Sequence, residues 1–134
     1  MAGEPLALLA GRARAPAAAR AGAEAWCAAG NCLSLQKEHD AAIRCFHRAI
    51  AVAPRFAYAY TLCGHEYVAN EDFERAVAMY RHAMRIDERH YNAWYGLGAI
   101  YYRQEKYDFA EHHLRKARMK GRSRGAWNAQ RLRS

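Results

Sequence analysis

The chain has 134 residues, a formal net charge of +8 and a composition that is 52% hydrophobic and 25% charged. The charge is unevenly placed: residues 115–134 contain eight Lys or Arg and no acid, whereas residues 23–114 contain ten basic and twelve acidic side chains. The central part therefore lacks the basic surface of a nucleic-acid-binding domain, and no apolar run in the chain is long enough to span a membrane.

The first 22 residues are rich in Ala and Arg and contain Pro5 and Pro16. Their apolar run, residues 6–10, is short for a secretory signal. Several arginines and few acids are also features of mitochondrial transit peptides, but those are rich in serine and this segment has none. We predict a disordered leader over residues 1–22.

A repeat with a period of 34 residues follows the leader. Three copies align without gaps, and the aligned columns share residues of one kind. Examples of such columns are Trp26, Tyr60 and Trp94; Gly30, Gly64 and Gly98; and Ala42, Ala76 and Ala110. The order W-x2-L-G-x2-Y, then A-x3-F-x2-A and a proline, is the tetratricopeptide signature, in which each copy is a pair of helices.

Large residues within each copy fall at helical intervals, which predicts six helices. In chain order these cover residues 24–36, 40–52, 58–70, 74–86, 92–104 and 108–119. The predicted fold is all-α: a tetratricopeptide α-solenoid of three antiparallel helix pairs with disordered basic tails. The repeats cover residues 23–56, 57–90 and 91–119, and the repeat pattern then stops, which predicts a basic disordered tail over residues 120–134.

The sequence contains no pattern for catalysis or for a metal. The four cysteines form no C-x2-C pair, which argues against zinc and against a disulfide framework and favours a reducing compartment. His112 and His113 are adjacent, so a helix would turn them about 100° apart. No nucleophile, base and orienting group share a predicted pocket. We therefore expect no enzyme activity, no cofactor and no metal site.

The first helix of each repeat lines the concave side of such a stack, which predicts a binding surface for an extended peptide. Amide side chains could bond the peptide backbone, and aromatic side chains could wall its apolar groups. The predicted contacts are Glu24, Asn31, Tyr58, His65, Asn92, Tyr95, Tyr102 and Arg103. The alternative is that Tyr58, Tyr95, Asn31 and Asn92 only pack between helices.

Three stretches closely resemble consecutive repeats of the anaphase-promoting complex subunit 3 family: EAWCAAGNCLSLQKEHDAAI, YAYTLCGHEYV and RHYNAWYGLGAIYYRQEKY. Residues outside the general repeat pattern, such as Cys27 and His65, match as well. The resemblance implies a non-catalytic scaffold of that mitotic ubiquitin ligase, located in nucleus and cytoplasm. Its implied partners are other subunits of the complex and the Ile-Arg tails of coactivators and of a core subunit. The family's N-terminal half, which dimerises, has no counterpart in this sequence.

Members of that family carry more repeats on each side, so we expect this chain to be a fragment, an alternative isoform or an incomplete gene model. Two other functions stay open. An adaptor for chaperone tails would need a basic clamp, but Cys27 and Gly96 occupy clamp positions and only Asn31 fits. The basic tail could bind nucleic acid or an anionic membrane, although such a block is more often a solvated end. We expect no small-molecule, membrane or nucleic-acid partner for the repeats.

Overall fold

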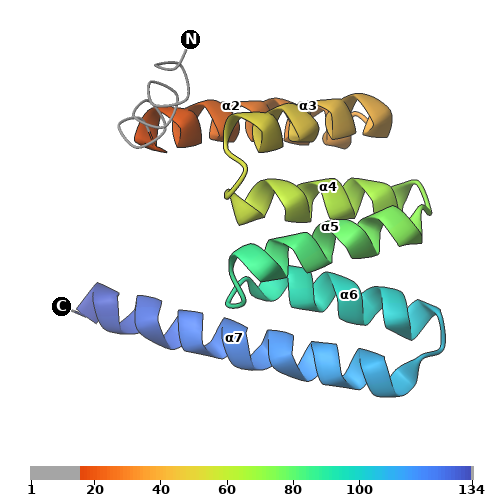
Figure 1. Cartoon of the computed structure of the whole chain (residues 1–134). Coiled ribbons are helices and arrows are strands. Elements are labelled where there is room, and N and C mark those ends of the chain that lie inside the picture. Colours follow the sequence, from red (N-terminus) through yellow and green to blue (C-terminus); the bar gives the residue numbers. More distant parts are fainter. Residues whose placement is uncertain (1–15, 134) are drawn as a thin grey trace, which may run out of the picture.

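The structure, a computed structural model, describes residues 16–133, including the side chains of residues 17–122. Within these residues all regular structure is α-helix, and the helices are joined by short turns (Figure 1). In chain order they are α2 (Pro16–Leu35), α3 (His39–Val52), α4 (Ala57–Ala69), α5 (Phe73–Ile86), α6 (Tyr91–Arg103) and α7 (Tyr107–Arg133). Three antiparallel pairs, α2 with α3, α4 with α5 and α6 with α7, stack in chain order, which confirms the predicted fold.

The helix bounds differ from the prediction at both ends of the stack. α2 begins at Pro16, inside the predicted disordered leader, because proline suits the first helical position and the alanines after it favour helix. α7 continues to Arg133, although we predicted its end at residue 119 and disorder over residues 120–134. Residues 118–133 contain no proline, and extending a helix is easier than starting one. The predictions for residues 1–15 and 134 lie outside the described residues.

The core runs through the whole stack. Small residues of the repeat pattern allow the helices to approach closely: Ala42, Ala76 and Ala110 are all buried. The buried residues form two clusters, and Ile50, Tyr67 and Met79 pack against both of them. Because these residues connect the clusters, neighbouring repeats share one continuous core, as expected when a single helix pair cannot bury its apolar face alone.

The ring of Tyr80 on α5 is the most enclosed part of this core. Tyr80 is 1% exposed. A Cβ added at Gly64 of the same repeat would lie 2.6 Å from its ring, and a Cβ added at Gly96 of the next repeat would lie 2.5 Å from it. The ring therefore fills a slot between α4 and α6 that exists only because both facing positions are glycine.

The turn inside each repeat has the same backbone conformation. Lys37 has a φ of 62°, in the left-handed region that residues with a side chain enter at a cost. Its N–H donates to the Ser34 carbonyl at 2.9 Å, and the Glu38 N–H donates to the Leu33 carbonyl at 2.9 Å. These two bonds define a Schellman motif, which usually has glycine at the left-handed position. The other two repeats place Glu71 and Glu105 there, with φ of 60° and 61°.

We expect Lys37→Gly to raise the free energy of unfolding by about 0.5–1 kcal/mol, because glycine adopts positive φ without steric cost. Chemical denaturation of the 134-residue protein would measure it. Lys37→Ala is the control, since it removes the same charge but keeps the Cβ. An equal gain from Lys37→Ala would mean that the charge, and not the backbone, is the cause.

The loop between repeats is tied down by the aromatic residue that begins the next helix. The Tyr60 hydroxyl donates to the Pro54 carbonyl at 2.8 Å, and the Trp94 indole N–H donates to the Glu88 carbonyl at 2.8 Å. Tyr60 and Trp94 occupy the same column of the repeat. The polar atom of this column therefore anchors the loop that precedes its helix in repeats 2 and 3.

Candidate peptide-binding surface

The first helices of the three repeats lie next to one another. α2 contacts α4, and α4 contacts α6, whereas the second helices α3, α5 and α7 make no comparable contact with one another within the described residues. Ala59 and Ala93, which are fully buried, allow this approach. The first helices therefore lie on the inner side of the stack, where the repeats come closest. We call the exposed side of α2, α4 and α6 that carries the eight predicted contact residues the first-helix surface.

None of the eight predicted residues belongs to the core. Tyr58, Tyr95 and Tyr102 are 40%, 60% and 62% exposed. The side chains of Asn31 and Asn92 are half-buried. The remaining three residues, Glu24, His65 and Arg103, are exposed. The tyrosine rings are therefore accessible to a ligand, and their contact with a peptide stays a prediction.

The structure spreads these residues over a surface and does not gather them into one pocket. Tyr58 and Asn92 stand at the N-terminal ends of α4 and α6, and Glu24 stands in the middle of α2, whereas Tyr102 and Arg103 stand at the C-terminal end of α6. Eleven residues of α-helix separate the two ends by about 16 Å. The surface could therefore hold only a ligand that is itself extended.

Several of these residues already have partners within the chain. Arg20 pairs with Glu24 at 3.3 Å, and the guanidinium of Arg103 lies 5.0 Å from the centroid of the Phe73 ring. The rings of Tyr102 and Tyr107 are 5.6 Å apart, and the ring of Tyr58 lies 6.4 Å from that of His90. By contrast, three of the eight predicted residues make no hydrogen bond, ion pair or ring contact to other described residues: Asn31, Asn92 and Tyr95.

His65 joins the first-helix surface to the interior. Although the residue is exposed, its Nδ1 lies 2.6 Å from the hydroxyl of the buried Tyr80. Burial lowers the pKa of His65 below its ordinary value; the nearby Glu66 carboxylate opposes this shift and His90 adds to it. The imidazole is therefore neutral at pH 7. The sequence placed His65 on this surface but gave no sign of its bond to Tyr80, fifteen residues away.

One column of the repeat is buried in two copies and exposed in the third. Cys27 and Thr61 are buried, whereas Tyr95 in the same column is exposed. The Thr61 hydroxyl donates to the Ala57 carbonyl at 3.4 Å within its own helix. α4 and α6 cover the earlier copies, whereas residues 104–133 of the described chain add no further first helix over α6. The exposure of Tyr95 thus reflects its place in the last repeat, which spacing alone did not reveal.

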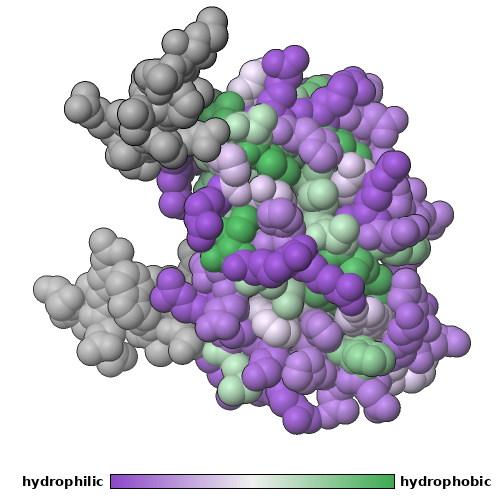
Figure 2. All heavy atoms as spheres, in the orientation of Figure 1, coloured by the Kyte–Doolittle hydropathy of each residue, from purple (hydrophilic) through white to green (hydrophobic). Residues whose placement is uncertain are grey.

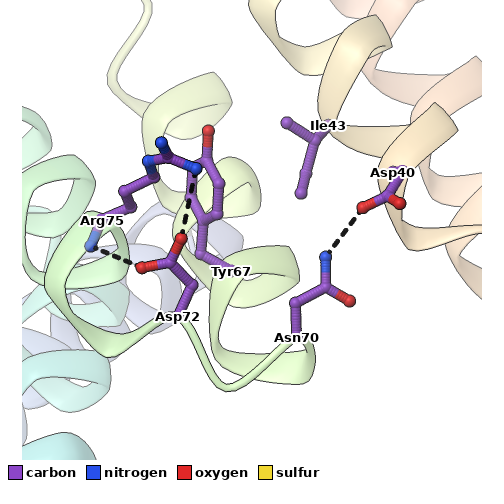
Figure 3. Close-up of a pocket in the computed structure, with 6 residues that line it drawn as sticks. All are labelled: Asp40, Ile43, Tyr67, Asn70, Asp72 and Arg75. Carbon is purple, nitrogen blue, oxygen red and sulfur yellow. Dashed lines mark hydrogen bonds and ion pairs between the residues drawn. The ribbon is translucent and has the colours of Figure 1, made fainter.

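A separate hollow of about 200 Å³ lies between repeats 1 and 2 (Figure 3). The Asn70 amide crosses it and donates to Asp40 at 3.0 Å, and Arg75 pairs with Asp72 at 3.4 Å. Its walls are completed by Ile43 and Tyr67. Because its charged and amide groups bond one another, we interpret the hollow as a junction between repeats and not as a ligand site.

The cysteines among the described residues form no disulfide bond. Cys27 and Cys63 are buried, and burial raises their pKa values to about 11 and about 12, with Glu24 and Glu66 adding to the respective shifts. Such thiols are poor nucleophiles at neutral pH. No group of His, Cys, Asp and Glu among the described residues is arranged to hold a metal ion. None of the described helices is both long and apolar enough to cross a bilayer.

Comparison with known proteins identifies the class first. The Tetratricopeptide repeat profile matches residues 23–56, and the TPR repeat profile matches residues 64–105. Together these matches cover more than half of the chain, and the chain belongs to the tetratricopeptide-repeat family. The fold agrees: the crystal structure of MamA has a TM-score of 0.72 at 27% identity, over 78% of this chain and 61% of MamA.

Within that family the chain is similar to subunit 3 of the anaphase-promoting complex. It is 50% identical over 94 residues to Anaphase-promoting complex subunit 3 of Schizosaccharomyces pombe, covering 70% of this chain and 14% of that protein. It is 60% identical over 94 residues to Cell division cycle protein 27 homolog B of Arabidopsis thaliana, covering 70% of this chain and 13% of that protein. The chain thus spans less than a sixth of the length of these curated relatives.

A second solved structure is a fold neighbour from another context. The second TPR of Spaghetti (RPAP3), bound to the HSP90 peptide SRMEEVD, has a TM-score of 0.72. Its identity to this chain is 19%, and the alignment covers 79% of this chain and 97% of that one. At this identity the likeness concerns the fold alone.

Proposed function

We propose that the chain is a non-catalytic scaffold segment that acts within the anaphase-promoting complex, in nucleus and cytoplasm. The observation that carries this proposal is the identity of 50% and 60% to two subunit 3 relatives, each over 94 residues. A scaffold needs a continuous core and exposed binding faces, and no reactive group. The stack has a continuous core and exposed helix faces. Other subunits of the complex are the proposed partners.

The first-helix surface is the proposed place for a partner's peptide tail. Its free amides, Asn31 and Asn92, could bond a peptide backbone without breaking any contact of the protein. Tyr58 and Tyr95 could wall an apolar side chain, and Glu24 could meet a cationic one. Both side chains are half-buried and make no hydrogen bond within the described residues, so a peptide would exchange only water at these groups.

A peptide ending in Ile-Arg should bind the 134-residue protein weakly, with a Kd of about tens of micromolar, since three repeats offer a short surface. We expect Asn92→Ala and Tyr95→Ala each to weaken binding about fivefold or more, because each removes a direct contact. Isothermal titration would measure both. Phe109→Ala is the matched control: Phe109 is 61% exposed, like Tyr95, but lies on α7 outside the surface.

Three outcomes would count against the peptide site. If all three variants bind like the wild type, the first-helix surface is not the site. If Phe109→Ala weakens binding as much as Tyr95→Ala, contact is nonspecific and aromatic. If no peptide binds at high micromolar protein, the peptide site fails, and the scaffold proposal rests on co-purification of the protein with other subunits from mitotic cells.

Two other functions make different predictions. An adaptor for chaperone tails would bind the peptide SRMEEVD more tightly than the Ile-Arg peptide, although the buried Cys27 and Gly96 leave no basic clamp here. Nucleic-acid binding would use the basic stretch of α7 that begins at Arg115, where Arg115, Lys116 and Arg118 are exposed. Binding of a single-stranded oligonucleotide that falls steeply between 50 and 200 mM salt would support that function.

A further inference from the structure

The bond between Tyr80 and His65 fixes which ring nitrogen of the histidine carries the proton. Their polar atoms are 2.6 Å apart, and Tyr80 is almost completely buried. A buried hydroxyl needs an acceptor, and the His65 Nδ1 is the one hydrogen-bond partner that this hydroxyl has among the described residues. The hydroxyl therefore donates, Nδ1 accepts, and the proton of the neutral imidazole is on Nε2.

The Tyr80 ring cannot swing away from this arrangement. It is enclosed between Gly64 on α4 and Gly96 on α6, at the distances given above. The same column of the other repeats holds Phe46 and Leu114, which have no hydroxyl. The inward bond to a surface histidine is therefore a feature of the second repeat alone, and Phe46 shows that the slot accepts a phenyl ring.

From this geometry we propose that Tyr80 is a positioning residue of the peptide site. Its hydroxyl holds His65 so that Nε2–H faces the first-helix surface and donates to a carbonyl or carboxylate oxygen of the bound peptide. This inference rests on the proposed peptide-binding function. Because Nδ1 points into the core and the residue is exposed, the Nε2 edge is the one that faces solvent.

The neighbours of His65 suit this role. Tyr58 precedes it by seven residues on α4, so it lies on the same side of the helix two turns away. Asn31 occupies the same column one repeat earlier and offers a free amide donor. The first helices of repeats 1 and 2 thus present one donor each in this column, which holds Ala99 in repeat 3, and two neighbouring donors suit the backbone of an extended chain. The lowered pKa of His65 keeps the ring neutral and this tautomer populated at pH 7.

The test follows the tautomer and the affinity in the whole protein. We expect nitrogen-15 NMR at pH 7 to show His65, assigned by comparison with His65→Gln, as the Nε2–H form. Tyr80→Phe should give a mixture of the two tautomers and weaken binding of an octapeptide ending in Ile-Arg about three- to tenfold. Tyr60→Phe is the matched control. It removes a comparable buried hydroxyl with a 2.8 Å bond to Pro54, away from His65, and should leave tautomer and affinity unchanged.

The outcomes separate this inference from the function on which it rests. An Nδ1–H tautomer in the wild type, or a tautomer that Tyr80→Phe does not change, overturns the positioning by Tyr80. Binding that is equally strong in the wild type and in Tyr80→Phe overturns the donor role of His65. If the wild type binds no peptide, the proposed peptide site fails and the donor role with it, while the NMR result still decides the role of Tyr80.

Discussion

Gly96→Ala should lower the free energy of unfolding by about 2 kcal/mol, since overpacking a core costs about 1–3 kcal/mol. The added methyl would lie 2.5 Å from the Tyr80 ring, well inside van der Waals contact. The ring cannot retreat, because Gly64 holds its opposite side. α6 would have to move away from α5, which opens the contact between repeats 2 and 3. For a stack of this size the melting temperature should fall by about 10 °C, measurable by circular dichroism.

Gly121→Ala is the matched control for this prediction. It makes the same substitution in helix α7, where the nearest atom to the new Cβ would be 3.7 Å away on Tyr91. Alanine favours a helix over glycine by about 1 kcal/mol, so this variant should be as stable as the wild type or more so. A stable Gly96→Ala protein would show that the Tyr80 slot is looser than the structure has it.

A double variant identifies the cause of the Gly96→Ala effect. Leu114 stands in the column of Tyr80 in the third repeat, so Tyr80→Leu introduces a side chain that the fold already uses there. Tyr80→Leu alone should destabilise the protein by leaving part of the slot empty. The double variant Tyr80→Leu with Gly96→Ala should lose less unfolding free energy than the sum of the two single variants, because the methyl fills the space that the ring vacates. If the two losses are additive, the effect of Gly96→Ala does not come from contact with the Tyr80 ring.

His39→Ala should also destabilise the protein strongly, by about 2 kcal/mol, because it leaves a buried carboxylate without its partner. The Glu66 side chain on α4 is buried at 5% residue exposure, and its Oε2 lies 2.5 Å from the Nδ1 of His39 on α3. This pair crosses the contact between repeats 1 and 2. Urea denaturation at pH 7 would measure the loss, with Glu38→Ala, an exposed neighbour on the same turn, as the control.

The contact between repeats 2 and 3 has apolar residues at the positions of both partners of this pair. Phe73 occupies the column of His39, and Ile100, which is 1% exposed, occupies the column of Glu66. Since replacing both partners of a buried hydrogen bond by apolar residues of suitable shape can be nearly neutral, we expect His39→Phe with Glu66→Ile to be close to the wild type in stability. Either single change should destabilise. If the double variant is as unstable as the single variants, the contact between repeats 1 and 2 differs in shape from the contact between repeats 2 and 3.

The availability of a side chain on the first-helix surface depends on contacts that the repeat pattern does not describe. Asn31 and Asn92 were predicted from their columns and proved to be half-buried with free amides. Arg103 came from the same reasoning, but its guanidinium lies over Phe73, so a ligand would have to displace it or stack beside it. Predicting a column is therefore easier than predicting what its side chain already contacts.

The sequence by itself determined the fold class, the number of helix pairs and the position of the turns. The inner helix bounds lie within one residue of the predicted ones. This was possible because the 34-residue pattern records local requirements: apolar residues at helical spacing, glycine or alanine where helices cross, and polar residues in the turns. The peptide-binding role of the eight residues on the first helices stays a prediction.

Only the tertiary structure decided which residues meet across repeats. The pairs His39 with Glu66 and Tyr80 with His65 join residues 27 and 15 positions apart, and no local pattern marks either one. The stack also decided that Thr61 is buried while Tyr95 in the same column is exposed, because α6 covers α4, whereas none of the described helices covers α6 in the same way. A repeat pattern specifies what each helix pair needs, whereas burial and hydrogen-bond partners depend on what the neighbouring pair places against it.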